Sequence, residues 1–209
     1  FVLDNEDYKR YSKRFSNIKY ITNFYLDNVS KEKGGDGSVF FIGRYLKERE
    51  LPISQIAKFF RKKNVKTNIN IIARSKRIRK RIQSSDINIL KDVLPYSKML
   101  SMLKSASYIL DFENAEQSGL TFRVFESLYF QKKLITNCEQ IYRYDFYHPN
   151  NIFVWNENNI GDLEAFLLKP YQSIDDCVIK KYSFSNWLKN VINEKPFIEI
   201  NYPAKVERL

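Results

Sequence analysis

The chain has 209 residues, of which 44% are hydrophobic and 15% aromatic, enough apolar surface for a packed core and too much for a disordered protein. No apolar run approaches the length needed to cross a bilayer, and two cysteines are too few for a disulfide framework. A reduced, cytoplasmic setting is therefore expected, and the formal net charge of +11 favours anionic partners.

The first part of the chain is rich in Tyr, Lys and Asn, and residues 17–26 alternate loosely enough to predict a strand. Three of the six glycines then gather at residues 34–37, which indicates a boundary. Because the chain begins with Phe1 and not Met, we expect a fragment. Residues 1–36 are interpreted as a linker or remnant of an N-terminal domain.

From residue 37 onward, strand-like and helix-like segments alternate with short connections. Short apolar runs typical of buried strands occupy residues 38–43, 67–73, 87–90, 108–112, 133–137 and 151–156. Segments typical of helices occupy residues 50–63, 95–107, 120–130, 160–168 and 182–192. This order predicts an α/β, Rossmann-like fold, with a parallel sheet, helices on both faces and right-handed crossovers. The predicted domain spans residues 37–172, and residues 173–209 form a C-terminal helix and tail.

The positive charge is unevenly distributed. Between residues 51 and 85 there are eleven Lys and Arg side chains and no acid, with the densest run from Arg74 to Arg81. A solvated helical face explains such a run, and so does binding to anionic lipid, to a phosphorylated acceptor or to nucleic acid. No motif for sequence-specific nucleic-acid binding accompanies it.

Ligands of open α/β sheets bind beyond the carboxyl ends of the strands, so the loops that follow the predicted strands should line one cleft. After the first strand, Gly43 permits a close turn, and Arg44 and Lys47 place cations at the cleft, where a diphosphate would pair with them. Solvated loop charges explain the same residues without a ligand.

The loop after residue 112 carries the second group of candidate residues. Gly119 precedes a helix whose first turn contains Thr121, and free N–H groups at a helix start attract anions. Arg123 and Glu126 are three residues apart and share a face of that helix. A capped helix with an internal ion pair is the alternative interpretation, but it does not explain the polar loop before the helix.

These segments, in this order, resemble the C-terminal, donor-binding domain of GT-B-fold bacterial glycosyltransferases that build lipopolysaccharide or capsular polysaccharide. The resemblance covers roughly residues 38–168. Its strongest part is the sequence SGLTFRVFESLYFQKKLITN at residues 118–137, and "FIGR" followed by Lys47 matches the loop of the family that contacts the donor diphosphate.

The resemblance implies a role for each matching residue. The donor diphosphate would be bound by Arg44, Lys47, Gly119, Leu120 and Thr121. The donor sugar or a phosphate would be contacted by Gln117, Ser118 and Arg123, the ribose by Glu126, and the base would be flanked by Val93, Leu94, Pro95 and Tyr96. Many relatives have Glu at the position of Ser118, so recognition of the sugar is expected to differ.

The resemblance also implies the partners. The donor would be a nucleoside diphosphate sugar, with no cofactor and no metal, and the acceptor a glycan or a polyprenyl-linked molecule. An N-terminal domain, missing from this chain, would bind the acceptor, so no catalytic residue is assigned. His148 precedes a proline in a loop and is not a convincing base. The basic segment would contact the inner face of the membrane, and no specific nucleic acid is expected.

Two other functions fit the same residues. One is another enzyme on the GT-B fold, such as a nucleotide-sugar epimerase or a polymer glycerophosphotransferase. The other is a non-enzymatic module that binds lipid or nucleic acid through the basic segment.

Overall fold

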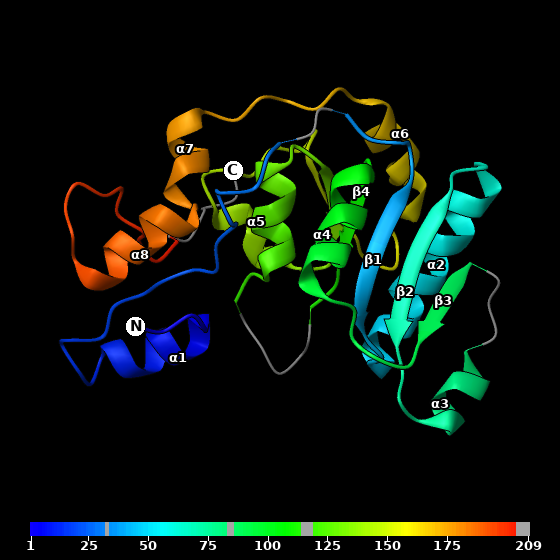
Figure 1. The fold of residues 1–209 in the computed structure, drawn as a ribbon, viewed down its shortest axis with the longest axis horizontal. Helices are drawn as coiled ribbons and strands as arrows, with labels where there is room; N and C mark the ends of the chain where they lie inside the picture. The colour runs from blue at the N-terminus through cyan, green and yellow to red at the C-terminus, as the bar shows by residue number, and fades with distance from the viewer. Residues whose placement is uncertain (32–33, 83–85, 114–118, 204–209) are drawn as a thin grey trace.

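The structure is a computed structural model that describes residues 1–31, 34–82, 86–113 and 119–203. Its centre is a six-stranded parallel sheet with the strand order β3-β2-β1-β4-β5-β6 (Figure 1). The strands are β1 (Val39–Arg44), β2 (Thr67–Ile72), β3 (Ile87–Leu90), β4 (Tyr108–Asp111), β5 (Lys133–Thr136) and β6 (Ile152–Val154). The sequence predicted each of the six to within about two residues.

The helices and short 3-10 turns connect these strands. The α-helices are α1 (Asn5–Ser12), α2 (Glu50–Lys62), α3 (Lys76–Arg81), α4 (Tyr96–Ser105), α5 (Phe122–Tyr129), α6 (Leu163–Leu168), α7 (Asp176–Lys181) and α8 (Phe184–Ile192). The 3-10 turns are η1 (Lys47–Arg49), η2 (Glu139–Arg143) and η3 (Ile160–Asp162). Among the helices of the described ranges, none is both long and apolar enough to span a membrane.

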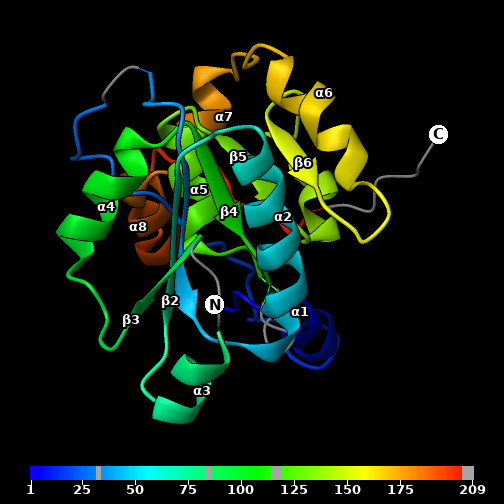
Figure 2. The same cartoon turned by 90° about the vertical axis from the view of Figure 1, so that its right-hand side faces the viewer.

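Two hydrophobic clusters cover the two faces of the sheet. Successive strand residues point to opposite faces, so Phe40 joins the cluster under α4 and α5 while Phe41 joins the cluster under α2 and α6. Figure 2 shows the sheet nearly edge-on, with α4 on one side and α2 on the other. The predicted Rossmann-like α/β fold with helices on both faces is therefore confirmed.

The first thirty residues differ from the prediction. No strand forms at residues 17–26, where Tyr20 and Tyr25 make isolated bridges to Val2 and Ser183. A helix that the sequence did not indicate, α1, begins after Asp4, whose carboxylate accepts hydrogen bonds from two backbone N–H groups. Its sequence has no apolar stripe, and it is anchored by ring contacts between Tyr8, Tyr20 and Tyr202. Partners so distant in sequence leave no local pattern.

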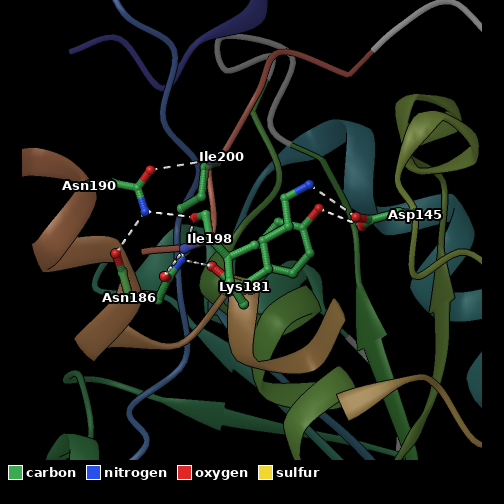
Figure 3. A network of polar contacts seen from close by, with 7 residues as sticks. Asp145, Lys181, Asn186, Asn190, Ile198 and Ile200 are labelled. Atoms are coloured by element: carbon green, nitrogen blue, oxygen red, sulfur yellow. Dashed lines mark hydrogen bonds and ion pairs between the residues drawn. The ribbon is translucent and has the colours of Figure 1, made fainter. Parts of the chain in front are cut away.

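The C-terminal helix α8 holds the tail that follows it through two asparagines (Figure 3). The side-chain amide of Asn186 donates to the carbonyl oxygen of Ile198 at 2.8 Å and accepts from its N–H at 2.7 Å. Asn190 donates to the same carbonyl at 2.9 Å and accepts from the N–H of Ile200 at 3.3 Å. Nearby, Asp145 accepts from Tyr182 at 2.7 Å and pairs with Lys181 at 3.0 Å. The tail is thus held by hydrogen bonds between asparagine side chains and its backbone, and the side chains of the tail itself do not indicate this contact.

We expect Asn186→Ala to lower the melting temperature by about 5 °C, because it leaves the N–H group of Ile198 without its partner and removes one of two donors to the Ile198 carbonyl. Thermal unfolding followed by circular dichroism measures this change. Asn158→Ala removes an exposed amide of the same type and should leave the melting temperature within about 1 °C. Equal melting temperatures for the two variants would show that the tail contributes nothing to stability.

Candidate functional site

The strand order places β1 beside β4 in the middle of the sheet, where the chain reverses the direction in which strands are added. The two strands pair through Val39 with Tyr108 and Phe40 with Ile109. Beyond these pairs β1 continues to Arg44 and β4 to Asp111 without further pairing between them. Ligands of open α/β sheets bind at this kind of switch point, outside the carboxyl ends of the strands.

A small cavity lies at this point, which we call the central cavity. Its lining residues are Arg49, Asp111, Glu113, Gly119, Leu120, Thr121 and Cys138. They come from the turn after β1, the end of β4, the start of α5 and the residues that follow β5. The chain therefore brings four separate segments to the place where the parallel sheet opens.

The cation in the central cavity is Arg49, which the sequence analysis did not select. Its Nε donates to the backbone carbonyl of Glu113 at 3.4 Å. Gly43 makes room for it, since a Cβ atom there would lie 3.2 Å from the Arg49 guanidinium and 2.9 Å from the ring of Phe41. Burial lowers the pKa of Arg49, but an arginine remains charged at neutral pH.

Arg44 and Lys47, which the resemblance assigned to the diphosphate, are exposed and do not line the central cavity. Arg44 ends β1 and Lys47 begins η1, so both lie in the segment that leads to Arg49 and outside the lining of the central cavity. The signal for Arg49 was present in the sequence, two residues after Lys47, but only the 3-10 turn shows which cation turns inward.

Asp111 ends β4 and is 7% exposed. Burial raises the pKa of its carboxyl group to about 6, although a hydrogen bond with Thr121 and the positive charges of Arg49 and Arg123 act in the opposite direction. A carboxylate with a perturbed pKa at a switch point is typical of functional sites. The sequence contains this acid within the apolar segment 108–112, but it was not selected as a site residue.

The start of α5 forms the opposite wall. Thr121 is its N-cap residue, and its hydroxyl oxygen accepts a hydrogen bond from the N–H of Arg123 at 3.1 Å. Leu120 presents its carbonyl to Asn23, which donates to it at 2.8 Å. At Gly119 the backbone lies close to the backbone of Leu3, since a Cβ atom there would be 2.8 Å from the carbonyl oxygen of Leu3. Gln117 and Ser118 lie outside the described residues.

A second group of predicted residues meets between α4 and α5. Glu126 is 1% exposed, and its two carboxylate oxygens accept hydrogen bonds from the Tyr96 hydroxyl, at 2.8 Å, and from the Arg123 guanidinium. Arg123 also contacts the sulfur of Met99. Burial and the charge of Glu126 raise the pKa of Tyr96, so the phenol stays protonated and donates. The ion pair between Arg123 and Glu126, expected if α5 is simply a capped helix with an internal ion pair, does form. The hydrogen bond from Tyr96 to Glu126 was not part of that interpretation.

The segment predicted to flank a base precedes α4. Val93 is 57% exposed and Tyr96 is 43% exposed, while Pro95 caps the helix in an extended conformation. Through the hydrogen bond from Tyr96 to Glu126, this segment is joined to α5 and so to the central cavity. The basic segment forms α3 after β2, below the sheet in Figure 1, where Arg81 pairs with Glu50 at 3.1 Å.

Among the described residues, no three His, Cys, Asp or Glu side chains cluster as metal ligands would. His148 lies in a turn, where its Nδ1 accepts from the N–H of Asn150 at 3.1 Å. The lining of the central cavity is of mixed charge: Arg49, the Thr121 hydroxyl and the start of α5 suit an anion, whereas the carboxyl groups of Asp111 and Glu113 do not.

No protein-family model and no curated protein matches the sequence. One solved structure with a similar fold is the crystal structure of TarM, a glycosyltransferase. The TM-score is 0.57 at 14% sequence identity, over 92% of this chain and 42% of the TarM chain. This chain thus spans less than half the length of TarM, and at this identity the similarity establishes the fold alone.

The raised pKa of Asp111 predicts a pH-dependent stability. The carboxyl group of an unfolded Asp has a pKa near 4, whereas burial raises the pKa of folded Asp111 to about 6. The folded state therefore binds this proton more tightly than the unfolded state does. The resulting stabilisation is lost as the pH rises through about 6. Relative to Asp111→Asn, the native chain should lose about 5 °C in melting temperature between pH 4 and pH 7. Asp92→Asn, which replaces an exposed carboxylate, controls for net charge. Parallel curves for the native chain and Asp111→Asn would contradict the prediction.

Proposed function

We propose that this chain is the donor-binding half of a GT-B glycosyltransferase, which transfers a sugar from a nucleoside diphosphate sugar to a glycan or lipid-linked acceptor in cell-surface polysaccharide synthesis. The observation that carries the proposal is the convergence of Arg49, Thr121 and the start of α5 on the cavity between β1 and β4. The similarity of the fold to that of a glycosyltransferase supports it.

In this proposal, the diphosphate binds over the mouth of the central cavity, whose own volume of about 20 Å³ is that of a single water molecule. One phosphate would lie at the start of α5, where it replaces the Thr121 hydroxyl as the acceptor for the Arg123 N–H, and the Arg49 guanidinium offers a planar pair of donors. Arg44 and Lys47 add charge at the mouth. Fixed donors of this kind stabilise the charge that develops on the leaving diphosphate, which is how the site would contribute to transfer.

Glu126 is proposed to bind the ribose, with the base beside Val93 to Tyr96. Both oxygens of Glu126 are already hydrogen-bonded, so a ribose hydroxyl would replace the Tyr96 hydroxyl while the ion pair with Arg123 stays in place. Exchange of one neutral donor for another retains the hydrogen bond at small net cost. Tyr96 would then be free to turn toward the base.

The groups that activate the acceptor, and most of its binding site, are proposed to belong to a preceding domain, as the resemblance implies. An epimerase or a glycerophosphotransferase could use the same donor site. Analysis of the products formed by a protein that contains both domains separates these reactions.

We expect UDP or GDP at a concentration of about 100 times its Kd to raise the melting temperature by about 5 °C, because it binds the folded state alone. Arg49→Leu should weaken nucleotide binding about tenfold or more, since it removes a charged pair of donors. Arg10→Leu, which removes an exposed cation from α1, serves as the matched control. If UDP, GDP and inorganic diphosphate all leave the melting temperature unchanged, the proposal is wrong.

Glu126→Gln should weaken UDP binding about tenfold and leave the binding of inorganic diphosphate undiminished, because it removes the charged acceptor for the ribose alone. Tyr96→Phe keeps that acceptor and should bind UDP at least as tightly as the native chain. Isothermal titration calorimetry with both ligands measures the difference. An equal loss of both ligands in Glu126→Gln would show that Glu126 acts by holding α5 and not by binding ribose.

A further inference from the structure

A second, larger cavity of about 960 Å³ lies at the carboxyl ends of β5 and β6, and we call it the outer pocket. Its volume is typical of ligand sites in proteins. Asn137 lines it, and the side-chain oxygen of Asn137 accepts from the N–H of Glu113 at 2.8 Å. Since Glu113 and Cys138 line the central cavity, the two cavities are neighbours along the same edge of the sheet.

Aromatic rings form part of the outer pocket. Tyr142 and Tyr147 both line it and pack edge to face with centroids 4.8 Å apart, and Trp155 lines it from the end of β6. Flat rings with apolar faces and polar edges bind molecules that are themselves apolar on one face and polar at the rim. A pyranose ring has this character, with C–H groups on its faces and hydroxyl groups around it.

The indole N–H of Trp155 is a donor without a partner. The side chain belongs to a residue only 7% exposed, and within the described ranges its Nε1 atom makes no hydrogen bond. A buried donor left unpaired is costly and is rare in folded proteins. The neighbouring backbone is satisfied, since the N–H of Trp155 donates to Thr136 at 2.6 Å, so the orphaned group is the one on the side chain.

The remaining lining is polar and of mixed charge. Glu139 and Glu157 supply carboxylates, Arg143 a guanidinium, and Gln140 and Asn156 amides. Two acids beside one base give the outer pocket no excess of positive charge, and, unlike the central cavity, it has no α-helix N-terminus among its lining residues, so an anion is less favoured there. Amides and carboxylates together offer both donors and acceptors, and hydroxyl groups can meet either kind.

We propose that the outer pocket binds a neutral saccharide, with sugar rings on Tyr142, Tyr147 and Trp155. A sugar oxygen accepts from the Trp155 indole once a shift of the neighbouring side chains uncovers its Nε1 atom, which is buried in the free chain. If the proposed function holds, on which this last step rests, the saccharide is part of the acceptor, placed beside the diphosphate in the central cavity. Saccharide binding itself can be measured without any donor, so the two proposals fail separately.

The two tryptophans of the chain provide the test. Trp187→Phe leaves Trp155 as the single indole, and its emission should change on titration with maltotriose, chitotriose or mannotriose. Trp155→Phe leaves Trp187 in α8 as the single indole. The Trp187 indole N–H already donates to the carbonyl of Thr22 at 2.8 Å, so its emission should stay constant on addition of the sugars. Emission that changes equally in both variants would place the saccharide elsewhere and overturn the proposal.

Affinity gives the second readout. By saturation-transfer NMR, Trp155→Phe should bind the responding trisaccharide about tenfold more weakly than Trp187→Phe, because one hydrogen bond is lost while the ring remains. No binding of any of the three sugars up to about 20 mM overturns the proposal. A change in Trp155 emission on addition of UDP, without a change on addition of the sugars, also overturns the proposal, because it would assign the pocket to the donor. If UDP binds and no sugar does, the proposed function stands without this inference.

Discussion

The pairing of β1 with β4 in the middle of the sheet governs the arrangement of the site. Val39 and Phe40 pair with Tyr108 and Ile109, and the two strands then run on to Arg44 and Asp111 without pairing with each other, although each stays paired with its outer neighbour. The backbone groups on the facing edges of these two carboxyl ends must therefore find partners outside the sheet. The turn after β1, the start of α5 and the residues after β5 fill that opening and build the central cavity.

The charges of the site are semi-buried and depend on one another. Arg123 neutralises Glu126 and also lowers the cost of ionising Asp111, while Arg49 acts on Asp111 from the other side. In such surroundings each charge is costly unless it is compensated, so removing one changes the protonation of its neighbours. An anionic ligand would enter an array that already contains two arginines, and it would compete with Asp111 for their charge. This competition gives the protonation of Asp111 a direct bearing on ligand binding.

The N-terminal segment is part of the same structure. Leu3 approaches Gly119 so closely that a side chain there would collide with its carbonyl oxygen, and Asn23 donates to Leu120. Aromatic rings of Phe24, Phe122, Phe184 and Trp187 pack together between this segment, α5 and α8. The positions of Gly119 and Leu120 thus depend on residues 97 or more positions away in the chain.

Local patterns in the sequence determined the strands and most of the helices. Apolar runs of four to six residues gave β1 to β6, and the stripe of Ile53, Ile56 and Phe60 gave α2, because burial on a sheet face is written into neighbouring residues. The sequence also placed Thr121, Arg123 and Glu126 on one helix, since their spacing is local. It did not reveal α1, whose partners are distant.

The tertiary structure decided which of these residues meet. Arg49 and not Lys47 enters the cavity because the 3-10 turn after β1 directs it there, and Glu126 is bound by Tyr96 because α4 packs beside α5. The unpaired indole of Trp155 in the outer pocket is visible only once β5 and β6 lie side by side. Residue type and order are properties of the chain, whereas hydrogen-bond partners, burial and pKa depend on segments that only folding brings together.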